Sequence, residues 1–115
     1  KTIMKKSLII FTLLFTFSYV NSQENKSAAK RASNAVTTIL SEIELSDEKA
    51  KFLEQTLYAK YANNALKIKG KNLSQDEKKN VYKNAFKATR KVLRKQFSET
   101  EVKSIIRLER QANKK

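Results

Sequence analysis

The sequence has 115 residues, a formal net charge of +14, a single glycine, and no cysteine, histidine, proline or tryptophan. Without Cys or His the chain has no thiol or imidazole to serve as nucleophile, general base or transition-metal ligand. One glycine is also too few for a phosphate-binding loop or a dinucleotide-binding fingerprint, so we expect one small domain that is not an enzyme and needs no metal or cofactor.

Residues 1–22 have the pattern of a signal peptide. Two lysines precede a largely apolar run from Leu8 to Val20, which is shorter than the roughly 20 residues of a membrane-spanning helix. Small and polar residues follow this run, which predicts cleavage between Ser22 and Gln23. We therefore expect an exported, periplasmic protein, with an uncleaved membrane anchor as the alternative.

The remaining part, residues 23–115, is predicted to be a single all-α domain of about four helices. Good helix formers dominate it and no proline interrupts it. Removing the signal takes away three lysines and no acid, so this part carries a net charge of +11. The first helix is predicted from about Lys26 to Ile43, with one apolar face at helical spacing. This face consists of Ala29, Ala32, Val36, Ile39, Leu40 and Ile43.

The second helix is predicted from Ser46 to Lys69 and has two apolar stripes. The third starts at Ser74 and contains the stretch Lys79–Phe97, which is rich in Lys and Arg and has no acid. One face of this helix consists of Val81, Tyr82, Ala85, Phe86, Thr89, Val92, Leu93 and Gln96, and the simplest interpretation makes this face a core stripe. The fourth helix starts at Ser98, and its inward side consists of Val102, Ile105, Ile106 and Glu109.

Three serines mark the predicted helix starts, because a serine hydroxyl can accept from the open backbone N–H groups of a first turn. They are Ser46, Ser74 and Ser98. Glu77 and Glu101 lie three residues after the second and third of these serines, which predicts capping boxes. Gly70, the only glycine, is predicted to end the second helix with a positive φ.

The second and third helices are joined by a short turn at Gly70–Leu73 and are predicted to form a long antiparallel hairpin, flanked by shorter helices. Each arm would be about 30–35 Å long at 1.5 Å per residue. A lone hairpin cannot bury both apolar stripes of its first arm. The flanking helices would cover part of this surface and a second copy of the chain the rest, so we expect a homodimer.

Two segments that bracket the hairpin, LSDEK at Leu45–Lys49 and FSETE at Phe97–Glu101, resemble the paired L-T-x-x-Q motifs of the Spy/CpxP family. The leucine is matched by Leu45 and Phe97, and Ser46 and Ser98 replace the threonine. Lys49 and Glu101 stand where the family has glutamine, and only Glu101 can accept from a backbone N–H. The resemblance covers roughly residues 43–110. It implies a small periplasmic all-helical protein that forms thin curved dimers and acts as an ATP-independent chaperone or a modulator of the envelope-stress response.

Between Lys60 and Lys95 the sequence has twelve Lys or Arg residues and two acids. A surface of this kind can attract unfolded or acidic protein segments by long-range steering and hold them through aromatic contacts. A polyanion or an anionic membrane surface is the alternative partner, and a merely solvated face is the simplest interpretation. The export signal, together with the lack of a helix-turn-helix or aromatic RNA-binding pattern, argues against nucleic acid. The candidate partner-binding residues are Lys79, Lys83, Lys87, Arg90, Lys91, Arg94, Tyr82, Phe52 and Tyr58. An ordinary core position is the competing interpretation for each aromatic.

Overall fold

The computed structural model describes residues 25–114, which form four α-helices and no strand. The helices are α2 (Lys26–Leu40), α3 (Asp47–Ile68), α4 (Gln75–Leu93) and α5 (Glu99–Asn113). The predicted all-α fold with four helices is confirmed. Within residues 25–114 no helix combines the length and the apolarity that crossing a membrane requires. The predicted signal peptide and its cleavage position lie outside the described residues.

The predicted serine caps start α3, α4 and α5. The hydroxyl of Ser46 accepts from the backbone N–H of Lys49 at 3.2 Å. At α4 and α5 the serine and the glutamate three residues later exchange hydrogen bonds in both directions, which completes the two predicted capping boxes. Because each motif is contained within four consecutive residues, it can be recognised from the local sequence alone.

Helix α2 ends at Leu40, three residues before the predicted Ile43. The hydroxyl of Ser41 donates to the carbonyl oxygen of Thr38 at 2.6 Å, and the backbone N–H of Ser41 is shared between the carbonyl oxygens of Thr37 and Thr38. A serine that bonds back to the preceding turn offers the backbone an alternative to the helical ladder. This local competition accounts for the earlier end of the helix.

The turn after α3 uses the only glycine. Lys69 has φ −65° and ψ 131°, Gly70 has φ 74°, and the backbone N–H of Lys71 donates to the carbonyl oxygen of Ile68 at 3.1 Å. These values define a type II turn, whose third residue needs a positive φ. A Cβ atom at position 70 would meet nothing within 4 Å, so the glycine is required by conformation and not by space.

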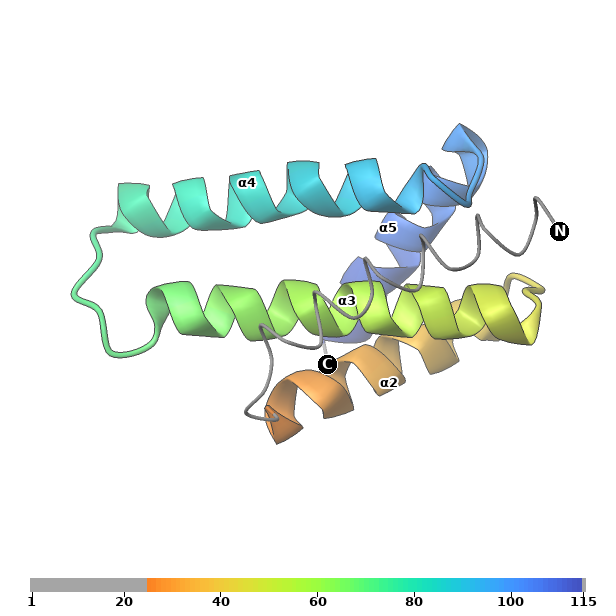
Figure 1. Ribbon diagram of the computed structural model, residues 1–115, viewed down its shortest axis with the longest axis horizontal. Coiled ribbons are helices and arrows are strands. Elements are labelled where there is room, and N and C mark those ends of the chain that lie inside the picture. The colour runs from red at the N-terminus through yellow and green to blue at the C-terminus, as the bar shows by residue number, and fades with distance from the viewer. Residues whose placement is uncertain (1–24, 115) are drawn as a thin grey trace, which may run out of the picture.

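Figure 1 shows α3 and α4 side by side as an antiparallel hairpin, with α2 along the lower side of α3 and α5 crossing the hairpin obliquely. All four helices contribute to one hydrophobic core. Its most deeply buried large side chains are Ile39, Leu53, Leu57, Leu93, Val102, Ile105 and Leu108. Among residues 25–114 the members of this core lie between Ala28 and Leu108.

The end of the hairpin that carries the glycine turn projects beyond α2 and α5 (Figure 1). On α4 only Thr89 and Leu93, near its C-terminus, are buried. Tyr82 is 54% exposed, and on the facing arm Leu66 is 59% exposed. The interpretation of this apolar face as a core stripe therefore holds for its C-terminal half only, because α5 covers α4 only near its end.

Candidate functional site

An open groove of about 560 Å³ lies where the projecting part of the hairpin meets α2 and α5, and we call it the hairpin groove. Its apolar lining is Tyr61, Ala65, Ile68, Tyr82 and Phe86. Its basic lining is Arg31, Lys60, Lys69, Lys83 and Arg110. The only acid in the lining is Glu109. The groove therefore combines an apolar surface with a basic rim contributed by all four helices.

A hydrogen-bonded cluster around Glu109 forms one wall of the groove. Glu109 is 4% exposed, and its Oε2 accepts from the hydroxyl of Tyr61 at 2.6 Å and from Lys60 Nζ at 2.9 Å. Asn113 Nδ2 donates in turn to the hydroxyl oxygen of Tyr61 at 3.1 Å. The buried carboxylate is thus paired and hydrogen-bonded, as a buried charge must be. The cluster joins α3 to α5.

Tyr61 is held in its protonated form. Burial, and then the negative charge of Glu109, raise the pKa of Tyr61 far above its ordinary value of 10.0. The guanidinium of Arg31 lies 4.2 Å from the centre of the Tyr61 ring, on the side of α2. Contacts of this kind are attractive because the ring face is electron-rich. Tyr61 consequently connects α2, α3 and α5 at the base of the groove.

The residues that line the hairpin groove have a net positive charge. Lys60 and Glu109 neutralise each other. The other four cations of the lining, Arg31, Lys69, Lys83 and Arg110, form no ion pair within the part of the chain that the structure describes. An anionic ligand would meet these four charges over an apolar surface. This arrangement is suited to binding a segment that is both acidic and partly apolar.

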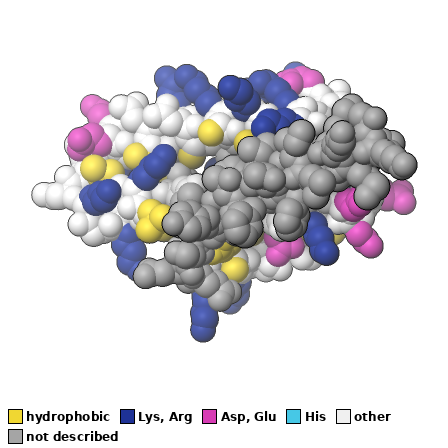
Figure 2. Space-filling model, in the orientation of Figure 1, with side chains coloured by type: hydrophobic (Ala, Val, Ile, Leu, Met, Phe, Trp, Pro, Cys, Tyr) yellow, Lys and Arg dark blue, Asp and Glu magenta, His cyan; other side chains and the backbone are white. Residues whose placement is uncertain are grey.

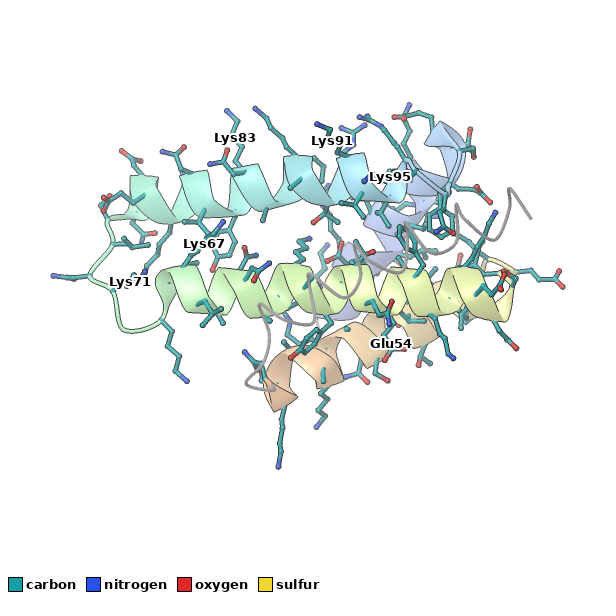
Figure 3. All side chains as sticks on the ribbon, viewed as in Figure 1. Glu54, Lys67, Lys71, Lys83, Lys91 and Lys95 are labelled. Carbon is teal, nitrogen blue, oxygen red and sulfur yellow. The ribbon has the colours of Figure 1, made fainter. Side chains whose placement is uncertain are left out.

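The structure separates the predicted partner-binding residues of the stretch 79–97 into three groups, the third being Arg90 and Arg94. Tyr82 and Lys83 line the hairpin groove, whereas Lys79, Lys87 and Lys91 are exposed without lining it. Figure 3 shows Lys91 extending from α4 on the side away from α3. Figure 2 shows Lys and Arg gathered along the edge formed by α4, with hydrophobic side chains at the surface between α4 and α3.

Arg90 and Arg94 have an acidic partner. Both donate to the carboxylate of Glu99 at the start of α5, with shortest distances of 3.0 Å. Hydrogen bonds from Arg94, assisted by the charges of both arginines, lower the pKa of Glu99 below its ordinary value of 4.5. These two predicted binding residues therefore connect α4 to α5, and their charge is partly compensated.

Phe52 is not available as an exposed contact, and Tyr58 is only partly exposed. Phe52 is buried, with its ring centre 6.2 Å from that of Phe97. Tyr58 is half-buried against the core, and its hydroxyl accepts from the backbone N–H of Asn25 at 3.0 Å. Their core interpretation is the one that the structure supports. A single amphipathic pattern cannot show which of two apolar stripes faces the core, because that depends on where the flanking helices pack.

The two segments that resemble the L-T-x-x-Q motifs lie close together in space. Lys49 Nζ lies 5.6 Å from the centre of the Phe97 ring, and Leu45 and Phe97 both pack in or against the common core. Hydrogen bonds from Ser98, helped by the charge of Lys49, lower the pKa of Glu101. The starts of α3 and α5 therefore form one local cluster at the end of the hairpin opposite to Gly70.

Two features of the site were not predicted from the sequence, the cluster around Glu109 and the contribution of Arg31. The hydrogen bond between Tyr61 and Glu109 joins residues 48 positions apart, and no local pattern indicates such a pair. Four basic residues in α5 and at its C-cap were also not predicted as binding residues, although their spacing is a detectable signal. They are Lys103, Arg107, Arg110 and Lys114.

No protein-family model, curated protein or solved structure matches the chain. Among residues 25–114 no three acidic side chains come together in a cluster that could hold a metal ion. Function is therefore inferred from the groove and its surroundings.

Proposed function

We propose that the protein is a non-catalytic binding protein that holds unfolded or acidic segments of other proteins in the hairpin groove. The observation that carries this proposal is the uncovered apolar half of α4, which lies beside four cations without acidic partners among the described residues. Positive charge speeds the encounter with acidic chains, and the apolar lining retains their hydrophobic side chains weakly. Neither step needs ATP.

The Spy/CpxP-like arrangement of the sequence supports the same role. Two similar cap segments start α3 and α5, and an export signal is predicted before them. We accordingly propose that the protein acts in the periplasm, as an ATP-independent chaperone or as a modulator of the envelope-stress response. The binding partners would be protein clients or an acidic partner protein.

A homodimer belongs to this proposal. Leu66 and Tyr82 are large apolar residues that the described chain leaves more than half exposed. Leu66 does not line the hairpin groove, so a second copy that covered it would reduce the exposed apolar surface while leaving Tyr82 and the basic rim of the groove accessible. Sedimentation equilibrium of residues 23–115 tests the dimer directly, and a monomeric mass throughout the micromolar range would reject it.

The test of the main proposal is suppression of aggregation. A denatured acidic client protein is diluted into buffer at low salt with a several-fold molar excess of residues 23–115, and light scattering is followed without ATP. We expect scattering to fall, and the protection to weaken as salt rises from about 50 to 200 mM because the Debye length shortens. Unchanged scattering at low salt would contradict the proposal.

A matched pair of variants locates the activity. The variant Tyr82→Ser, Lys83→Glu removes one exposed apolar group and one cation from the groove, and we expect it to lose most of the protection. The control Leu40→Ser, Lys51→Glu makes the same kinds of change at exposed positions that do not line the groove. Equal protection by the two variants would show that the groove is not the binding site.

A further inference from the structure

A second basic surface lies between α4 and α5. Here an open hollow of about 470 Å³ is lined by five cations and by no acid. The cations are Arg90, Lys103, Arg107, Arg110 and Lys114. Arg90 is partly compensated by Glu99, whereas the four cations of α5 form no ion pair within residues 25–114. We call these four residues the α5 basic stripe.

The spacing of the stripe places its three helical residues on one face of α5, and Lys114, the C-cap residue with helical φ and ψ, continues the same face. The intervals are four, three and four residues, which keeps the same side of an α-helix throughout. At 1.5 Å per residue the stripe is about 16 Å long. Like charges at these intervals repel each other and weaken an isolated helix slightly. A face that concentrates them without acids between them is therefore suited to an extended anionic partner.

Aromatic and aliphatic contacts give this surface a fixed shape. The guanidiniums of Arg90 and Arg110 lie 5.6 and 5.7 Å from the centre of the Phe86 ring. Phe86 and Ile106 are half-buried and form a shallow apolar base between the cations. No large apolar side chain projects from this hollow. A partner would therefore be held mainly by charge and would contact only the exposed parts of Phe86 and Ile106.

We propose that the α5 basic stripe is a docking surface for anionic phospholipid membranes. Phosphate headgroups match arginine guanidiniums, which can donate two hydrogen bonds to one phosphate, and lysines add point charges. The exposed parts of Phe86 and Ile106 meet the boundary between headgroups and acyl chains. An array of phosphates suits a hollow that is lined by five cations and no acid, whereas the hairpin groove, where client segments are proposed to bind, has a larger apolar lining and contains Glu109.

The membrane surface and the hairpin groove can be tested separately. They share Phe86 and Arg110, so both residues are left unchanged. The stripe variant is Lys103→Gln, Arg107→Gln, Lys114→Gln. The matched control is Lys26→Gln, Lys30→Gln, Lys51→Gln, which removes the same charge from exposed positions on α2 and α3. Circular dichroism checks that both variants remain helical.

The experiment is co-sedimentation of residues 23–115 with vesicles of equal parts phosphatidylglycerol and phosphatidylcholine, or of phosphatidylcholine alone, in 50 mM NaCl. Each Lys or Arg near an anionic surface strengthens partitioning about fivefold. We expect binding to the anionic vesicles only, a loss of about 100-fold in the stripe variant, and a much smaller loss in the control. Raising NaCl to 200 mM should weaken all binding.

Three results would overturn the proposal. The first is no binding to anionic vesicles at 50 mM NaCl, and the second is an equal loss in both variants, which would indicate net charge alone. The third is duplex DNA binding that is at least tenfold tighter than vesicle binding and is lost in the stripe variant, which would assign the stripe to nucleic acid. Retained suppression of client aggregation by the stripe variant would show that the two surfaces act independently.

Discussion

At the scale of single residues, Glu109 is the one charged residue that is buried among residues 25–114. Its carboxylate accepts from Tyr61 and Lys60 and so connects α3 with α5 at the wall of the hairpin groove. Removing Glu109 would leave the buried hydroxyl of Tyr61 without an acceptor, which destabilises the fold. It would also take away the counter-ion of Lys60, whose side chain is only 17% exposed. The residue thus determines both stability and the shape of the site.

We expect Glu109→Ala to lower the free energy of unfolding by about 1–3 kcal/mol, measured by urea denaturation. Glu109→Gln should lower it less, because its amide oxygen can still accept from Tyr61. The exposed Glu54, which makes no hydrogen bond or ion pair among the described residues and is labelled in Figure 3, provides the control Glu54→Ala. A loss equal to that of Glu54→Ala would contradict the role given to Glu109.

Gly70 is the second residue with a specific requirement. Its φ of 74° suits glycine, and any residue with a Cβ is strained there. We expect Gly70→Ala to destabilise the protein by about 1–2 kcal/mol in urea denaturation, and Gly70→Asn to cost less, since asparagine tolerates this conformation better. Equal stability of Gly70→Ala and the unchanged protein would show that the turn can rearrange freely.

At the scale of elements, the start of α5 links helix capping to pH. The pKa of Glu101 is lowered first of all by hydrogen bonding to the backbone of Ser98, and that of Glu99 by hydrogen bonding from Arg94. A carboxyl whose pKa is lower in the folded state stabilises the fold at pH values above its unfolded pKa. This stabilisation is lost as the pH falls below about 4.5 and through the folded pKa.

We therefore expect the melting temperature to fall between pH 5 and pH 3, and to fall less steeply in Glu101→Gln, which lacks this titration. Ser98→Ala should also make the melting temperature fall less steeply between pH 5 and pH 3, because this substitution removes the hydrogen bond between the Ser98 hydroxyl and Glu101. Glu54→Gln serves as the control for loss of an acid elsewhere on the surface. A profile unchanged by Glu101→Gln would mean that other carboxylates account for the acid sensitivity.

The elements also show what could be predicted from the sequence. Ser46, Ser74, Ser98 and Gly70 each act within a few residues, so their motifs indicated the helix starts and the turn correctly. The burial of α4 could not be predicted in the same way, because it depends on where α5 crosses the hairpin.

The same limit applies to the candidate site. Tyr82 and Lys83 were predicted from their position on a basic amphipathic helix, and both line the hairpin groove. Phe52 shares the aromatic character of Tyr82 and yet is buried. Arg31 and Glu109 come to the groove from helices distant in sequence, and only the packing of α2 and α5 against α3 brings them there.

At the scale of the whole molecule, the chain has a packed part and a projecting part. All buried residues of α4 lie at its C-terminal end, whereas the hairpin end near Gly70 extends past α2 and α5 (Figure 1). Regions with few buried apolar contacts open more readily than the core. The projecting part contains much of the hairpin groove, so the proposed binding site is also the region expected to open most easily.

Hydrogen exchange can measure this difference. We expect the backbone amides of residues 78–88 in α4 to exchange at least tenfold faster than those of residues 53–62 in α3, and to slow when a client is bound. The amides of residues 102–108 in α5, a segment that contains the fully buried side chain of Ile105, serve as the internal reference. Uniform protection along α4 would contradict the division into packed and projecting parts.

The projecting end of the hairpin has a consequence for how such a chain can diverge. Because the core lies between α2, α5 and the other end of the hairpin, substitutions of exposed residues near the turn, apart from Gly70, would alter the surface offered to partners without disturbing the packing that holds the fold together. Selection on this end acts through what it binds, and selection on the packed end acts through folding. Adding or removing a helical turn in both arms would change the reach of the hairpin, so one architecture can acquire new partners while its interior stays the same.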